Sequence, residues 1–187
     1  MADLQKKSRM GSMRVAFGGI IAAVDLVLLF LTGLFPMGTL ALPALAGVLL
    51  LAVRIEVSAP WAAITYGMVA VLSFFLSPDK QAYALFTVFF GYYPVLKYTL
   101  ERLHHKAASW GLKFAVFNAA LVLYGGICLF LLQIDFTPIQ DSLYWSVPLV
   151  LIFGNMIFWI YDRALSGLAF LYWQRLHSAI NRLMREK

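Results

Sequence analysis

Long apolar segments, separated by short stretches that hold the charges and prolines, dominate this chain. With 62% hydrophobic and 13% charged residues, it has too little polar surface for a soluble domain of 187 residues. Inside a bilayer every backbone N–H and C=O must be paired, and a helix pairs them within the segment. Each helical span takes ~20 residues, which leaves room for about six spans and no soluble domain. We therefore predict an all-α, polytopic membrane protein.

Charges, prolines and polar clusters mark where the spans end. The expected spans are residues 14–35, 38–55, 60–77, 82–100, 110–133 and 143–161. Between them, "LFPMGT" and "LSPDKQ" are typical of tight turns, and "QIDFTPIQDS" of a longer polar loop. These boundaries predict a single membrane domain over residues 1–187, built as a six-transmembrane-helix bundle.

The distribution of cations predicts the orientation of the chain. If the N-terminus is cytoplasmic, all 15 Lys and Arg residues except Lys80 fall on the inner side. The positive-inside rule therefore predicts a multi-pass protein of the cell (inner) membrane with both termini cytoplasmic. This pattern explains the net charge of +6 without nucleic acid, so the lipid bilayer is the first expected partner.

The last segment, residues 164–186, differs from the spans because apolar and basic residues occupy different helical faces. The pattern predicts an amphipathic C-terminal helix on the inner leaflet. Two alternatives remain open, a docking helix for a partner protein and a plain extension of the sixth span.

Asp25 stands near the middle of the apolar run "GGIIAAVDLVLLFLTGLF". A charged side chain at that depth costs ~2.5 to 3.5 kcal/mol on insertion scales, so we expect it to face the bundle interior or a wet cavity. It is either a protonated or hydrogen-bonded packing residue, or a group that contacts a ligand or carries a proton.

Other polar and small residues also fall within the spans. Asn118 and Asn155 lie at similar depths in the fifth and sixth spans, so we expect them to bond across that interface as packing contacts. The first span contains two small-xxx-small pairs, Gly18 with Ala22 and Gly19 with Ala23, which allow another helix to approach closely.

The sequence offers little for catalysis or metal binding. His104 and His105 are adjacent and point about 100° apart on a helix, which is poor geometry for a shared metal. Cys128 is the single cysteine, and no HExxH, paired CxxC, GxSxG or Walker A pattern occurs. We predict no enzyme, catalytic residue, metal or cofactor, although an intramembrane enzyme stays open as an alternative.

Aromatic residues gather at the outer ends of the expected helices, where they predict a vestibule for a small ligand. With Asp25 deeper in the bundle, the candidate ligand-binding residues are Thr39, Tyr83, Phe86, Tyr144 and Trp145. The alternative is an ordinary aromatic belt at the membrane interface.

The inner end of the fourth span reads "FFGYYPVLKYTLERLHHK". Pro94 has no N–H to donate to Phe90, so we expect a kink near Gly91 to Pro94. Beyond it, Lys97 is expected to extend its ammonium to the surface, and Glu101 to join it in a modest surface charge cluster.

This pattern resembles the substrate-binding S components of energy-coupling-factor vitamin transporters. The likeness rests on short spans in a small chain, cytoplasmic termini, a first helix opening "RVAFGGIIAAVDLVLL" and the turn "FPMGTLALPALAG". It implies solute binding in the outer half and docking of the first helix on a transmembrane coupling subunit driven by ATPases. Residues Gly18, Gly19, Ala22 and Ala23 match the docking position, whereas Asp25 and the tail depart from the family pattern.

The leading hypothesis is therefore a solute-binding subunit that takes a small vitamin-like molecule from the outer side. The competing hypotheses are a structural or assembly protein of the cell envelope and a small transporter that uses Asp25 as a proton site.

Overall fold

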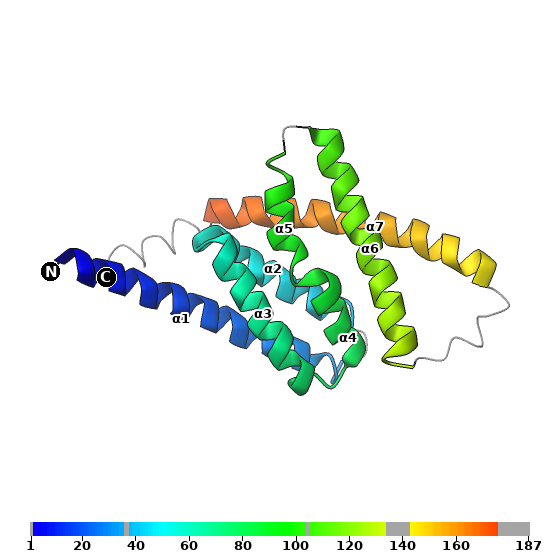
Figure 1. The fold of residues 1–187 in the computed structure, drawn as a ribbon, viewed down its shortest axis with the longest axis horizontal. Coiled ribbons are helices and arrows are strands. Elements are labelled where there is room, and N and C mark those ends of the chain that lie inside the picture. Colours follow the sequence, from blue (N-terminus) through cyan, green and yellow to red (C-terminus); the bar gives the residue numbers. More distant parts are fainter. Residues whose placement is uncertain (1, 36–37, 104, 134–142, 176–187) are drawn as a thin grey trace.

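The computed structural model describes residues 2–35, 38–103, 105–133 and 143–175, and every regular element in these ranges is a helix. In chain order (Figure 1) the elements are α1 (Ala2–Leu31), α2 (Ala41–Glu56), α3 (Ala59–Leu76), α4 (Lys80–Leu85), the π-helix η2 (Phe86–Phe90), α5 (Tyr93–Leu100), α6 (Lys106–Phe130) and α7 (Leu143–Arg175). The expectation of an all-α protein is confirmed for this part of the chain.

Four of the described helices are long and apolar enough to cross a membrane. These segments are Gly11–Leu31 in α1, Ala59–Leu76 in α3, Lys106–Phe130 in α6 and Pro148–Gln174 in α7. Four such helices indicate a multi-pass membrane protein. The second expected span corresponds to α2, which has 16 residues, and the fourth is divided among α4, η2 and α5.

Large apolar side chains on the outer surfaces agree with a lipid environment. Phe75, Val122 and Phe130 expose between 72% and 80% of their surface. Large apolar side chains exposed to this degree are typical of a membrane or protein contact rather than of a water-facing surface.

The fourth expected span breaks where the proline predicts. The N–H of Gly91 donates to the carbonyl of Phe86 (2.8 Å), which closes the π-helix, and α5 begins with Pro94 in its first turn. The carbonyl of Thr87 loses its usual helical donor and instead accepts the hydroxyl of Tyr66 (2.6 Å). The predicted kink at Gly91 to Pro94 is confirmed, with a π-helix added before it.

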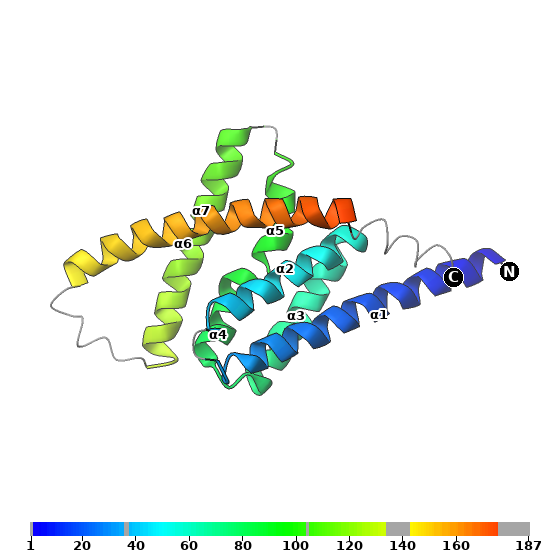
Figure 2. The same cartoon turned by 180° about the vertical axis from the view of Figure 1, so that it is seen from behind.

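The helices pack around two buried clusters. The first joins α1, α2 and α3, which lie against one another in Figure 1, and it includes Leu29, Leu50 and Val69 with Phe86 from η2. The second joins η2 and α5 to α6 and α7 around Phe89 and Phe158. Figures 1 and 2 both show α6 crossing α7 beside α5, so α7 meets the consecutive helices α5 and α6 there.

Residues 164–175 continue α7 without a break, so this part of the tail extends the helix of the sixth expected span. Leu165 is fully buried, which ties the extension to the rest of the fold. The remainder of the expected amphipathic helix, residues 176–186, lies outside the described residues, as does most of the outer loop "QIDFTPIQDS".

Candidate functional site

A cluster of charged side chains is buried where α5, α6 and α7 meet. Asp162 on α7 accepts hydrogen bonds from Lys97 Nζ on α5 (2.6 Å) and Lys113 Nζ on α6 (3.1 Å). The hydroxyl of Tyr93 donates to the same carboxylate (2.6 Å). Both lysines also reach Glu101 Oε1, at 2.7 and 2.8 Å. We call Tyr93, Lys97, Glu101, Lys113 and Asp162 the charge cluster.

Burial makes the pairing within the charge cluster obligatory. Asp162 is 1% exposed, Lys97 4% and Lys113 3%. A charge removed from water to this degree is tolerated only when partners and hydrogen bonds replace the lost solvent. Two lysines face two carboxylates, so the formal charges cancel. The charge cluster therefore holds α5, α6 and α7 together, because no charge of the cluster could be buried without partners from the neighbouring segments.

Glu101, just beyond the end of α5, is the most exposed carboxylate of the charge cluster. Its side chain is 44% exposed. Partial burial alone would raise the pKa of its carboxyl, but hydrogen bonds from Lys113 and Lys97 outweigh that effect and hold the pKa below the ordinary value of 4.5. The carboxylate is thus favoured over the acid form in the folded protein.

This lowered pKa predicts how stability changes with pH. Because the folded protein holds Glu101 ionised more strongly than the unfolded chain does, its contribution is complete above pH 4.5 and is lost as the pH falls through the folded-state pKa. We expect the difference in thermal unfolding midpoint between wild type and Glu101→Gln to be constant from pH 7 to about 6 and to shrink below 4.5. A difference that widened on acidification would contradict this assignment.

The expected surface position of the Lys97 ammonium is wrong, because Lys97 points inward to Asp162. The expected pairing of Glu101 with Lys97 is confirmed, and the Glu101 side chain is 44% exposed. No role was predicted from the sequence for Asp162 or Lys113. The available signal was a lone carboxylate and a lone lysine near the inner ends of neighbouring apolar segments, which is a pattern that predicts an ion pair.

Asn118 and Asn155 bond across α6 and α7, as expected. Each amide nitrogen donates to the other side chain's oxygen, at 3.0 and 3.1 Å. The second N–H of each amide donates to a carbonyl of its own helix, that of Phe114 or Leu151. The pair satisfies itself, which supports the packing role.

Asp25 lies on the inner face of α1 and is fully buried. Neither carboxylate oxygen has a hydrogen-bond partner among the described residues. Ala22 and Leu29, about one turn to either side, belong to the apolar cluster that α1 shares with α2 and α3. The expectation that Asp25 faces the bundle interior is confirmed, and its need for a partner is unmet.

The two small-xxx-small pairs of α1 differ in their exposure. Gly18 and Ala22 are buried, and a Cβ on Gly18 would lie 3.1 Å from Thr65 Oγ1 of α3. Gly19 and Ala23 are exposed, with open space around Gly19. The first pair therefore packs α1 within the chain, and the second pair is accessible from outside.

The described residues that were expected to line a ligand vestibule each contact a different part of the structure. The hydroxyl of Thr39 donates to Asp79 Oδ2 (2.8 Å), and Oδ1 of the same carboxylate caps α4. Tyr83 packs edge-on against Phe74, and Phe86 lies in the apolar cluster beside α1. The side chains of Tyr144 and Trp145 lie outside the described part of the structure.

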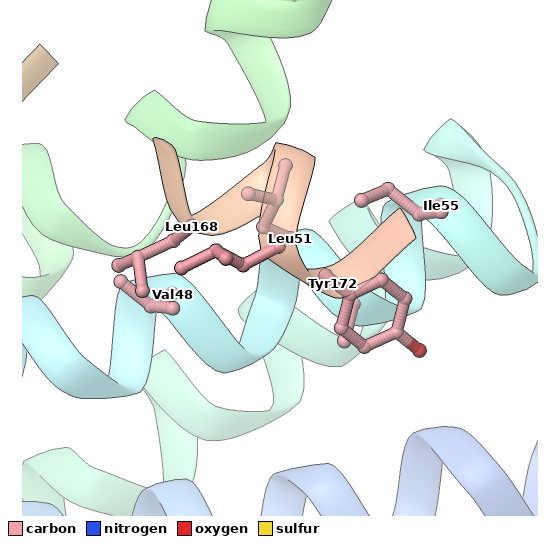
Figure 3. Close-up of a pocket in the computed structure, with 7 residues that line it drawn as sticks. Val48, Leu51, Ile55, Leu168 and Tyr172 are labelled. Atoms are coloured by element: carbon pink, nitrogen blue, oxygen red, sulfur yellow. The ribbon is translucent and has the colours of Figure 1, made fainter. Parts of the chain in front are cut away.

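An apolar groove of about 440 Å³ separates α2 from α7. Figure 3 shows Val48, Leu51 and Ile55 of α2 facing Leu168 and Tyr172 of α7. The Tyr172 hydroxyl, which donates to Glu56 (2.9 Å), is its main polar feature. Such a lining suits lipid chains rather than a polar solute.

No protein-family model matches this chain, and no curated protein or solved structure matches it either. Within the described ranges, no three His, Cys, Asp or Glu side chains come together in a way that would hold a metal ion. The class that the described helices indicate is an all-α, multi-pass membrane protein. Any narrower assignment depends on the charge cluster and on Asp25.

Proposed function

We propose that this protein is a membrane-embedded solute-binding and transport subunit. It takes a small vitamin-like solute from the outer side and depends on a transmembrane coupling subunit and ATPases for energy, as the resemblance to S components implies. In this proposal its six helical segments form a bundle with both termini in the cytoplasm. The bundle itself supplies the binding site, and its partners supply the energy.

Asp25 is the single observation that carries this proposal. Its carboxylate is fully buried in a membrane segment, and both oxygens lack a hydrogen-bond partner in the described part of the chain. An unsatisfied buried polar group is costly, and intramembrane ionisable residues commonly mark substrate or ion paths. A ligand that donates hydrogen bonds would remove that cost.

The two faces of α1 support a division between solute binding and docking. The inner face carries Asp25, and the outer face presents Gly19 and Ala23 without neighbouring atoms around Gly19. Small residues on an exposed helix face let a second helix approach closely. The coupling subunit would dock on that face without disturbing the solute site.

The test is thermal unfolding of the purified protein with a panel of water-soluble vitamins. A ligand at a hundred times its Kd should stabilise the wild type by about 2.7 kcal/mol. Asp25→Leu should abolish that shift, yet raise the stability of the free protein by about 1–3 kcal/mol because it removes an unsatisfied group. Gly19→Leu, at an exposed position of the same helix, should keep the full shift. A panel without any response, or an unchanged shift in Asp25→Leu, would contradict the proposal.

The charge cluster favours a second candidate, a structural or assembly protein of the cell envelope. Its charges are mutually satisfied and hold α5, α6 and α7 together, as a rigid scaffold requires. Loss of partner proteins on shortening the chain after Arg175, together with a flat vitamin panel, would favour this candidate. The proton-coupled transporter remains a third, which pH-dependent uptake by wild type and Asp25→Asn would test.

A further inference from the structure

A polar pocket of about 340 Å³ opens beside the charge cluster, between the start of α6 and the middle of α7. Its walls include Lys106, Ser109, Trp110 and Lys113 from α6 and Arg163 and Ser166 from α7. Unlike the apolar groove between α2 and α7, it is lined by hydroxyl groups and cations. We refer to it as the polar pocket.

Positive charge is in surplus around the polar pocket. The carboxylates that reach it, Glu101 and Asp162, are already paired with Lys97 and Lys113. Lys106 and Arg163 also line it, and no carboxylate of the described chain lies within salt-bridge distance of either. Within the described part of the chain, two cations of the polar pocket are therefore left without a carboxylate.

Aromatic rings hold the arginine of the pocket in place. The Arg163 guanidinium lies 5.9 Å from the centre of the Trp110 ring and 5.3 Å from that of Trp159. Stacking on aromatic faces restrains a guanidinium while leaving its N–H groups available for donation. Arg163 can therefore make a bidentate contact with a phosphate group.

The start of α6 adds to the attraction for an anion. Lys106 and Ser109 belong to the first turn of this 25-residue helix, and the N-cap residue His105 makes no side-chain capping bond. The first N–H groups of a helix carry partial positive charge and bind anions readily.

We propose that the polar pocket binds the phosphate group of an anionic phospholipid. The pocket lies where the apolar segment Lys106–Phe130 begins, so a lipid headgroup can reach it from the bilayer. It also lies on the cation-rich side of the chain, and the cytoplasmic leaflet on that side is the one that carries anionic lipids. Trp159 beside Arg163 is an aromatic side chain of the kind found at headgroup depth. This inference does not depend on the proposed solute-binding function.

The experiment measures lipid binding to the full chain in neutral detergent by native mass spectrometry. Phosphatidylglycerol and phosphatidylcholine are titrated separately, and inorganic phosphate is added as a competitor. We expect tighter binding of phosphatidylglycerol, weakened about tenfold or more by Lys106→Gln combined with Arg163→Gln. Lys106→Gln alone, at an exposed residue, should weaken binding without affecting folding.

Arg102→Gln is the matched control. Arg102 lies nearby and stacks on Tyr98 (5.0 Å), but it is not part of the polar pocket. Binding that survives in this variant and fails in the Lys106 and Arg163 variants supports the proposal. Equal binding of the two lipids, or an equal loss in Arg102→Gln, would overturn it. Displacement of phosphatidylglycerol by inorganic phosphate at similar concentration would overturn the lipid assignment in favour of a soluble phosphate.

Discussion

Asp162→Ala should destabilise the folded protein by about 3–5 kcal/mol, the cost of breaking a buried ion pair from one side. The substitution leaves Lys97 and Lys113 buried with only Glu101 to share, and it removes the acceptor for the Tyr93 hydroxyl. The contacts of α5 with α6 and α7 should loosen together. Denaturant unfolding in detergent micelles, followed by helical circular dichroism, measures the change.

Two further variants distinguish the effect on stability of losing the buried ion pair from the effect of removing a side chain. Glu101→Gln should cost much less than Asp162→Ala at neutral pH, because Glu101 is the more exposed carboxylate. Asp162→Leu combined with Lys97→Met should recover part of the loss, since replacing both partners of a buried pair by apolar residues is often neutral. Equal effects of the two carboxylate substitutions, or no recovery in the double variant, would contradict the assigned role.

Gly47→Ala should destabilise the protein by about 1–3 kcal/mol, the usual cost of inserting a methyl group into a packed core. A Cβ at this position of α2 would collide with the backbone carbonyl oxygen of Phe90, at the end of the π-helix. A backbone atom cannot rotate away as a side chain does, so α2 and η2 must separate. Thermal unfolding of the purified variant measures the effect.

Gly67→Ala is the control for that substitution. Gly67 also lies inside a helix, α3, but apart from its own chain neighbours and helix backbone no described atom would lie within 4 Å of the Cβ it would gain. Alanine there should be neutral or stabilise by up to about 1 kcal/mol, because it favours the helix. If both variants lost stability equally, close packing of α2 on η2 would not be the cause.

Much of the fold follows from local sequence. Each expected span overlaps a helical segment, and the break at Gly91 to Pro94 occurs where proline removes a donor. The Asn118–Asn155 pair was also predictable, because two amides at similar expected depth in consecutive apolar segments have few other partners. These features depend on the hydrophobicity of each segment, on the direction of the chain and on the missing N–H of Pro94.

The candidate site was predicted less well, because it depends on contacts between distant segments. Asp162 meets Lys97 and Lys113 over sequence separations of 65 and 49 residues. The spacing of apolar residues along the chain does not indicate which helices are neighbours in space. The same limit applies to α1, where Gly18 turned out to face α3 and Gly19 to face outward.

The sequence by itself determined that this chain is helical and belongs in a membrane, because apolar segments must satisfy their backbone within themselves. It also located Asp25 as a carboxylate in need of a partner. Only the tertiary structure decided which face each helix turns inward, and therefore that Lys97 is a buried partner of Asp162 and that Lys106 and Arg163 share a pocket. The physical reason is that the hydrophobicity of each segment follows from its local sequence. Charge pairing depends instead on how the helices rotate and cross, which local sequence does not specify.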